Sequence, residues 1–472
     1  MNSKKIITII TDFVVLLYIG IIIGWHLYTP RSNLAIQAPG ADNRPEGSAR
    51  SINDVLIGEY FRKFDNFSST FTGKWTCFRG ENLDNIIVTR EKINFSGADY
   101  HILWRIETGE GYAAPVIYNG RFYFLDYVEE LNSDALRCFS LETGKELWRR
   151  WYRSPMKRNH GFSRTVPAIG EGYIITIGPQ GHVMCCDPIT GNLKWTIDMQ
   201  KEFKTEVPFW YTGQCPRVDG DILILAPAGE EVLMCGIDVH SGKPVWTTSN
   251  TLKYKMSHSS VTPMSFGGKK MYVYAGVGGV CGVSAEEVDR GTLLWETSQW
   301  QPSVVAPSPV QVSANQIFTV AGYGAGGAML RVDRNGGKWT ASVTEQYKPN
   351  EGLSSEQQTP VLYKNMLISI MPKDGGRNRD RLVCFSPSNV RTPVWISDER
   401  FGLGPYIVIN NQLFLFNDDG ELFVYDIMQQ SMKLLKRQRI TNGVDAWGPM
   451  AYADGILIVR DDHTVVGMKI SE

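Results

Sequence analysis

The sequence predicts an all-β fold, an eight-bladed β-propeller, and two repeated patterns support this prediction. In the first pattern, a proline opens a short apolar run that turns at Gly or Asn about five residues later. The intervals between successive prolines are 44 to 52 residues, which is typical of a propeller blade. The eight positions are Pro115, Pro167, Pro216, Pro263, Pro309, Pro360, Pro405 and Pro449.

In the second pattern a tryptophan follows a glycine by four residues, as in Gly144 to Trp148. Glycine tolerates the positive φ of a hairpin turn, and the strand that follows carries the indole toward the next unit. Recurrence in nearly every unit indicates a packing role rather than a ligand site. The tryptophans assigned to this structural repeat are Trp104, Trp148, Trp195, Trp246, Trp295, Trp339 and Trp395.

The two ends of the repeat region complement each other. Trp104 precedes the first proline and belongs to a unit that has no proline, whereas the unit from Pro449 to Lys469 has a proline and no terminal tryptophan strand. We therefore expect the strand around Trp104 to pair with the C-terminal unit in one blade, since this removes an open sheet edge.

The N-terminal part of the chain has a different character. Lys4 and Lys5 precede an apolar stretch from Ile6 to Tyr28, about long enough to cross a bilayer. A cleavage site with small residues is not evident, which favours an uncleaved signal anchor over a removed signal peptide. The protein is then expected in the cell inner membrane with a single pass and the propeller on the periplasmic side.

These observations divide the chain into four parts. Residues 1–28 are predicted to be a cytoplasmic tip and transmembrane anchor, and residues 29–50 a flexible linker rich in Pro and Gly. Residues 51–74 are predicted to form a short helix and lead-in, because Leu56, Tyr60, Phe64 and Phe67 share one face at helical spacing. Residues 75–472 are predicted to form the propeller.

Charge and cysteine usage exclude several classes of function. The net charge of −1 argues against nucleic acid as a partner. Cys138 and Cys185 lie at equivalent positions of successive units, six residues before the turn glycine, which indicates small buried residues rather than a disulfide framework. Neither His160 nor His258 has a second His or Cys at ligand spacing, so no metal site is predicted.

The segments from Cys138 to Trp148 and from Cys186 to Trp195 resemble the repeat of the pyrroloquinoline quinone (PQQ)-type propellers. The resemblance covers about residues 75 to 470 and includes an opening segment, Trp75 to Gly80. It implies two different functions. Quinoprotein alcohol dehydrogenases are eight-bladed enzymes that hold PQQ and Ca²⁺, whereas BamB is a cofactor-free scaffold for outer-membrane β-barrel assembly. The adjacent Cys185 and Cys186 lie inside a repeat strand, unlike the vicinal disulfide of the dehydrogenases.

A binding site is expected where the segments before the eight prolines converge on one face, because loops there present unlike residues from different blades. The stretch from Phe203 to Tyr211 is the most unusual, since it joins a carboxylate to an aromatic platform. The non-repeating polar and aromatic candidates are His160, Arg164, Glu206, Trp210, Tyr211, His258, Glu356, Gln357, Asp445 and Trp447.

The resulting prediction is a membrane-tethered binding or scaffold module for a protein or an envelope polymer, without catalysis or cofactor. The alternative is a PQQ- and Ca²⁺-dependent quinoprotein dehydrogenase that oxidises an alcohol or a sugar. In that alternative, Trp210 or Trp447 would stack on the cofactor and a carboxylate such as Glu206 would act on the alcohol proton. The catalytic residues, the partner and the oligomeric state do not follow from the sequence.

Overall fold

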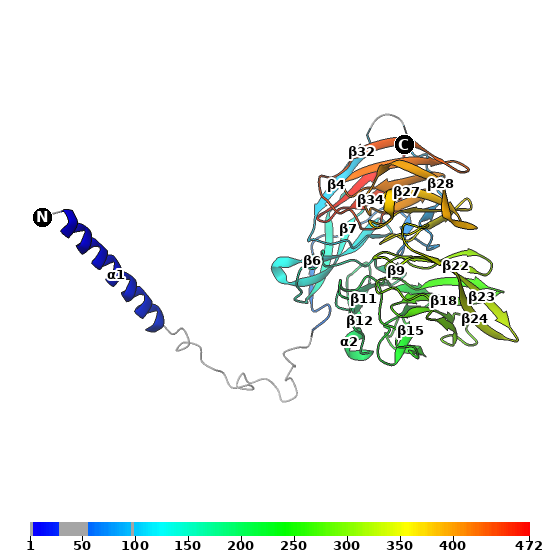
Figure 1. Ribbon diagram of the computed structural model, residues 1–472, viewed down its shortest axis with the longest axis horizontal. Coiled ribbons are helices and arrows are strands. Elements are labelled where there is room, and N and C mark those ends of the chain that lie inside the picture. The colour runs from blue at the N-terminus through cyan, green and yellow to red at the C-terminus, as the bar shows by residue number, and fades with distance from the viewer. Residues whose placement is uncertain (1–2, 28–54, 96–98) are drawn as a thin grey trace. The chain divides into compact units, whose positions relative to one another are not determined.

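A computed structural model describes residues 3–27, 55–95 and 99–472 (Figure 1). The chain divides into two compact units, Met1–Asp54 and Val55–Glu472. The first unit contains α1 (Ser3–Leu27). Within the described part of the chain, no helix has both the length and the apolar character needed to cross a membrane, so the predicted transmembrane segment is not confirmed. The predicted linker at 29–50 lies outside the described residues.

The second unit consists of eight sheets, which confirms the eight-bladed propeller. Blades 1 to 4 contain β5 (Val116–Tyr118), β6 (Arg121–Val128), β7 (Ser133–Ser140) and β8 (Glu146–Arg153); β9 (Ala168–Gly170), β10 (Tyr173–Ile177), β11 (His182–Cys186) and β12 (Leu193–Asp198); β13 (Arg217–Asp219), β14 (Ile222–Leu225), β15 (Val232–Asp238) and β16 (Pro244–Ser249); and β17 (Thr262–Phe266), β18 (Lys269–Gly276), β19 (Gly279–Ser284) and β20 (Leu293–Thr297).

Blades 5 to 8 contain β21 (Val310–Ser313), β22 (Gln316–Ala321), β23 (Gly326–Asn335) and β24 (Lys338–Tyr347); β25 (Val361–Tyr363), β26 (Met366–Ile370), β27 (Arg381–Ser386) and β28 (Asn389–Arg400); β29 (Tyr406–Ile409), β30 (Gln412–Phe416), β31 (Glu421–Ile427) and β32 (Met432–Arg439); and β33 (Ala451–Ala453), β34 (Ile456–Arg460), β35 (Thr464–Lys469) and β4 (His101–Glu107). In the described residues of the second unit, three short helices lie in connections: η2 (Glu129–Leu131), α2 (Met199–Glu202) and η3 (Gly376–Asn378).

The repeated prolines mark the innermost strand of each blade. The first strands of neighbouring blades, such as β5 and β9, contact one another and therefore surround the propeller axis. Pro167 lies directly before β9, and Pro263 is the second residue of β17. A proline fits here because the innermost strand is a sheet edge, where a missing N–H costs little.

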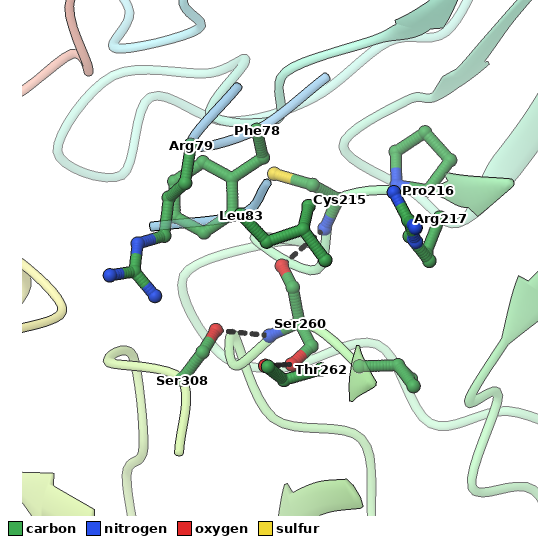
Figure 2. Close-up of a pocket in the computed structure, with 10 residues that line it drawn as sticks. Phe78, Arg79, Leu83, Cys215, Pro216, Arg217, Ser260, Thr262 and Ser308 are labelled. Carbon is green, nitrogen blue, oxygen red and sulfur yellow. Dashed lines mark hydrogen bonds between the residues drawn. The ribbon is translucent and has the colours of Figure 1, made fainter. Parts of the chain in front are cut away.

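Hydrogen bonds link the residues around these prolines from blade to blade. The backbone N–H of Val166 donates to Sγ of Cys215 (3.3 Å), and the N–H of Cys215 donates to Oγ of Ser260 (3.0 Å). The N–H of Ser260 donates to Oγ of Ser308 (3.1 Å), and that of Ser308 to Oγ1 of Thr359 (2.9 Å). Figure 2 shows the part at Cys215, Ser260 and Ser308. We call these five residues the axial collar.

The repeated tryptophans lie on the outer strands and pack between blades. A Cβ added to Gly144 of blade 1 would meet Trp104 of blade 8 at 2.6 Å, and one added to Gly242 of blade 3 would meet Trp195 of blade 2 at 2.6 Å. Both glycines also have positive φ, 67° and 70°. Glycine is therefore required at this turn for two reasons: it adopts the positive φ, and its lack of a Cβ leaves room for the indole of the preceding blade.

The cysteines occupy the core as small apolar side chains. All eight are free and buried. Cys185 belongs to the hydrophobic cluster shared with blade 3, whereas Cys186 belongs to the cluster shared with blade 1. The two neighbouring thiols therefore lie on opposite faces of β11, as alternation along a strand requires.

Antiparallel pairing of β4 with β35 closes the ring, with Trp104 opposite Gly467. This confirms the closure expected from the unmatched ends. The Trp104 ring stacks on Phe122 of blade 1 at 4.6 Å, and its Nε1–H donates to the carbonyl of Leu141 at 2.8 Å. Arg460, which is fully buried, adds hydrogen bonds from its Nη1 to carbonyls of blade 1 and its preceding loop.

The prediction of a helix within residues 51–74 is wrong for the described part, 55–74. Instead β1 (Tyr60–Lys63) adds an outer strand to blade 1 by pairing with β8. The outer edge of β8 offers unpaired N–H and C=O groups, and the pairing satisfies them. Tyr60 stacks on Trp151 at 5.6 Å.

Residues 74–87, which we call the axial strap, cross from blade 1 to blade 7. At one end β2 (Lys74–Trp75) pairs with the innermost strand β5, and at the other β3 (Ile86–Ile87) pairs in parallel with the innermost strand β29. Between them, a guanidinium N–H of Arg79 donates to the carbonyl of Pro360 in blade 6 at 3.3 Å. The strap therefore passes over the propeller axis.

Deleting residues 464–472 removes β35 and leaves β4 unpaired. The deletion discards the fully buried Val465, Val466 and Met468, each worth about 1.5–3 kcal/mol, so we expect a loss of about 5 kcal/mol or more in the free energy of unfolding. Urea unfolding of the full-length and shortened chains measures this loss. The exposed control Val288→Ser should leave stability within about 0.5 kcal/mol of wild type. Equal stability of the shortened chain would contradict the closure.

Candidate functional site

A pocket of about 380 Å³ lies where the innermost strands begin. Loops that precede these strands supply most of its lining, because each loop returns the chain from an outer strand to the axis at the same end of the ring. Seven of the ten sequence-predicted residues line the pocket: His160, Arg164, Trp210, His258, Glu356, Gln357 and Trp447. The segments before the prolines therefore converge on one pocket, as the sequence predicted.

Two aromatic pairs form walls of the pocket. The rings of Trp210 and Tyr323 stack with centroids 5.2 Å apart and an interplanar angle of 23°. The rings of Tyr112 and Trp447 lie 4.8 Å apart at 32°. Such surfaces suit a flat or apolar ligand group, because ring stacking adds to the gain from burying apolar area.

Phe78 of the axial strap closes the floor of the pocket. Its side chain lines both the pocket and a much smaller cavity of about 20 Å³ behind it (Figure 2). In Figure 2 the guanidinium of Arg79 points away from Cys215 and Ser260. The pocket therefore ends at the strap and the axial collar.

Arg164 is the cation held most firmly in the pocket wall. Its Nε–H donates to the carbonyl of Trp210 (2.5 Å), and its Nη2 donates to the carbonyls of Asn159 (2.7 Å) and His160 (2.8 Å). Its guanidinium carbon lies 5.7 Å from the centre of the Tyr112 ring. Burial lowers the pKa of Arg164 to about 10, so the side chain stays charged at neutral pH.

The other titratable groups of the lining respond to burial as well. Burial raises the pKa of Glu356, whose Oε2 accepts a hydrogen bond from the backbone N–H of Lys373 at 3.4 Å. Burial, together with the nearby charge of Arg164, lowers the pKa of His258 to about 4, so the imidazole is neutral at pH 7. The ammonium of Lys373 lies 5.6 Å from the centre of the Trp447 ring.

Asp418 orients Trp447 from behind. The indole Nε1–H donates to Oδ1 of Asp418 at 3.0 Å, and the same carboxylate accepts the backbone N–H of Leu403. Burial raises the pKa of Asp418 to about 6. The carbonyl of Trp447 accepts a hydrogen bond from Nε2 of Gln358 at 3.0 Å. Hydrogen bonds therefore hold both the indole and the backbone of Trp447.

Three sequence-predicted residues do not line the pocket. Glu206 is exposed and forms an ion pair with Lys255 at 2.7 Å. The hydroxyl of Tyr211 donates to the carbonyl of Lys157, and its φ of 66° turns the chain away after Trp210. Asp445 also has a positive φ, 54°, and its carbonyl accepts the backbone N–H of Trp447 at 2.8 Å.

Tyr112, Tyr323, Lys373 and Phe78 line the pocket although they were not among the predicted site residues. Tyr112 lies in the segment before Pro115, which the proline pattern already marked. Tyr323 and Lys373 lie between the second and third strands of their blades. In an antiparallel blade, that hairpin reaches the same end as the start of the first strand. The glycine-rich sequence from Gly322 to Gly327 is typical of a tight hairpin, but it does not indicate that Tyr323 lies at the pocket.

Comparisons with known proteins agree with this architecture. A family model described as "Outer membrane protein assembly factor BamB" matches residues 131–351 and 258–433, which together exceed half of the chain. The chain belongs to this family of PQQ-like repeat propellers. No curated protein sequence matches the chain.

Solved structures similar to this PQQ-like propeller include both kinds of relative. BamB from Moraxella catarrhalis is 12% identical and covers 79% of this chain and 100% of its own, with a TM-score of 0.51. Quinohemoprotein alcohol dehydrogenase from Comamonas testosteroni is 12% identical over 84% of this chain and 81% of its own, with a TM-score of 0.55. A europium-containing methanol dehydrogenase is 13% identical over 84% and 90%, also with a TM-score of 0.55. At these identities the likeness shows the fold alone.

The pocket of this PQQ-like propeller fits only part of what a quinoprotein cofactor requires. Its aromatic walls and Arg164 suit a flat anionic molecule. A Ca²⁺ ion needs six to eight oxygen ligands, several of them carboxylates. Glu356 is the one carboxylate among the lining residues, and no group of three or more His, Cys, Asp or Glu side chains in the described residues could hold a metal. The lining therefore does not fit the metal.

The raised pKa of Asp418 predicts a pH dependence of stability. The folded chain binds a proton between about pH 4 and pH 6 that the unfolded chain does not, so stability should fall as the pH rises through this window. From pH 4 to pH 8, the free energy of unfolding of Asp418→Asn relative to wild type should rise by up to about 3 kcal/mol. Urea unfolding at fixed pH measures this difference, with the exposed Asp221→Asn as the charge control. A difference that is constant with pH would contradict the assignment.

Proposed function

We propose that this chain is a non-catalytic binding or scaffold module of the cell envelope, and that its protein or envelope-component partner enters the axial pocket. The convergence of seven predicted side chains on one pocket with a closed floor carries this proposal. A closed, aromatic-walled pocket with a few fixed polar groups is a recognition site in general physical terms. Membership of the family described as an outer membrane protein assembly factor supports a protein partner.

The second candidate is a PQQ- and Ca²⁺-dependent dehydrogenase. The stacked pair Trp210 and Tyr323 favours it, since these rings could hold a flat cofactor, and so does the fold shared with alcohol and methanol dehydrogenases. The lining contains a single carboxylate, Glu356, and this argues against the dehydrogenase because Ca²⁺ binding requires several carboxylate oxygens. Glu206, the sequence-predicted catalytic carboxylate, is paired with Lys255 outside the pocket.

The proposal places the propeller outside the cytoplasm, tethered by the apolar segment 6–28. Its support is the sequence alone, in which Lys4 and Lys5 precede this segment and no small-residue cleavage site follows it. Mass spectrometry of the native protein from washed membranes should find an intact N-terminus. A mature chain that starts near residue 30, or a full-length chain in the cytoplasmic fraction, would contradict the tether.

A crosslinking experiment tests the pocket as the binding site. A photo-reactive amino acid at Phe209, which is 79% exposed and adjacent to Trp210, should capture the partner in intact cells. The additional substitution Trp210→Ala should weaken binding by about thirtyfold or more, because a buried tryptophan at an interface is worth about 2 kcal/mol or more. Loss of the crosslinked band on gels measures the effect.

The matched control carries the photo-reactive group at Val288, which is 88% exposed in the turn between β19 and β20. That turn lies at the opposite end of its blade and should give no Trp210-dependent product.

Purified protein supplied with PQQ and Ca²⁺ should neither bind PQQ stoichiometrically nor reduce a dye with simple alcohols. Stoichiometric PQQ binding that Trp210→Ala abolishes, together with alcohol-dependent dye reduction, would replace this proposal with the dehydrogenase.

A further inference from the structure

Arg164 is a half-buried cation whose hydrogen bonds leave part of the guanidinium available. Its three hydrogen bonds go to backbone carbonyls of Trp210, Asn159 and His160, and it forms no ion pair with any described residue. Its Nη1 makes no hydrogen bond with the described residues either. Glu110 acts on the Arg164 charge from a distance but forms its ion pair with Arg158, so an anionic ligand group at Arg164 gains both charge neutralisation and hydrogen bonds.

Three arginines that are more deeply buried than Arg164 differ from it in their partners or their position. Arg137 is neutralised by Asp126 and Glu146, at 2.7 and 2.8 Å. Arg79 and Arg150 donate to carbonyls, but neither lines the large pocket. Arg164 thus combines the lack of a direct ion pair with a described residue and access to a cavity that a ligand can enter.

The second cation of the lining, Lys373, is surrounded by acidic groups. Burial raises the pKa of Glu356, Asp418 and Asp445, and the charge of Lys373 offsets part of this rise in each. These carboxyl groups offset the Lys373 charge on their side of the pocket. Arg164 forms no ion pair with a described residue and is therefore the less compensated of the two cations in the lining.

The surroundings of Arg164 are preorganised and apolar. Two further hydrogen bonds join the same pair of loops, from Nδ2 of Asn159 to the carbonyl of Phe209 (2.7 Å) and from the hydroxyl of Tyr211 to the carbonyl of Lys157. The stacked rings of Trp210 and Tyr323 lie beside Arg164 in the lining. Because these loops are already held in place, a ligand loses little free energy to ordering them, and this favours affinity.

The rim next to Arg164 favours a peptide over a glycan. Phe209 is 79% exposed and Tyr323 is 53% exposed, so the neighbours of the charged site are large apolar side chains. A peptide can cover them with apolar side chains of its own, whereas the hydroxyl groups of a sugar would lose water without finding polar partners.

We propose that the pocket binds a peptide segment of the partner whose carboxylate pairs with Arg164 and whose neighbouring aromatic side chain packs on Trp210 and Tyr323. This inference rests on the proposed function and specifies the chemistry that the site recognises. A carboxylate accepts the free N–H donors of Nη1, and the adjacent ring extends the existing aromatic stack.

Two peptides of nearly identical size that differ by one carboxylate test the proposal by calorimetric titration of the full-length chain. Acetyl-Gly-Phe-Asp-Phe-Gly-amide should bind at least about thirtyfold more tightly than the Asn analogue, as expected for pairing with a half-buried charge. Arg164→Gln should abolish this preference, and a urea-unfolding midpoint equal to that of wild type shows that the variant remains folded. Arg391→Gln, a substitution of an arginine paired with Glu345 outside the pocket, should retain the full preference.

Each other outcome has a defined meaning. Equal affinity for the two peptides, or binding of neither, would overturn the inference. Arg164-dependent binding of oligomeric glucuronate without peptide binding would also overturn it and point to a glycan. If the partner crosslinked from Phe209 is lost with Trp210→Ala but not with Arg164→Gln, the binding function stands and the anion site does not. If the crosslink depends on neither residue, the proposed function itself fails.

Discussion

Pairing between β4 and β35 is the constraint on which the rest of the molecule depends, because a propeller holds its shape only as a closed ring. Each blade buries both faces against its neighbours, so an open ring would expose two faces and a sheet edge. Trp104 reinforces the junction by stacking on Phe122 and bonding to the carbonyl of Leu141 in the next blade. Closure in turn fixes the axis, and the axial collar and the pocket loops take their positions from it.

The axial strap converts that ring from an open channel into a site with a floor. Its ends pair with β5 and β29, innermost strands of blades 1 and 7, and Phe78 lies between them beneath the pocket. A ligand therefore meets loops that are anchored on rigid strands, and a floor that includes Phe78, while the sequence of the loops can vary. This division explains how one PQQ-like architecture can serve both scaffolds and dehydrogenases: the loops determine the chemistry.

The fold could be predicted because its signals are local and repeated, such as a proline at the start of an inner strand and a glycine four residues before an indole. The strap could not, since Asn85 bonds to the carbonyl of Tyr406, a residue 321 positions away with no matching pattern. In the site, single residues such as Trp210 were predictable from their place before a proline. Tyr211 was not excluded, because only its backbone φ turns it away, and Lys373 was missed because it enters from a different hairpin.

Hydrogen exchange of the full-length chain with and without its crosslinked partner tests most directly whether binding occurs in the axial pocket. The account predicts slowed exchange in residues 203–213 and 322–326, which carry Trp210 and Tyr323, while the outer strands β12 and β16 exchange as in the free chain. Slowed exchange along those outer strands, with the pocket loops unchanged, would show that the partner adds to a blade edge and would contradict the account.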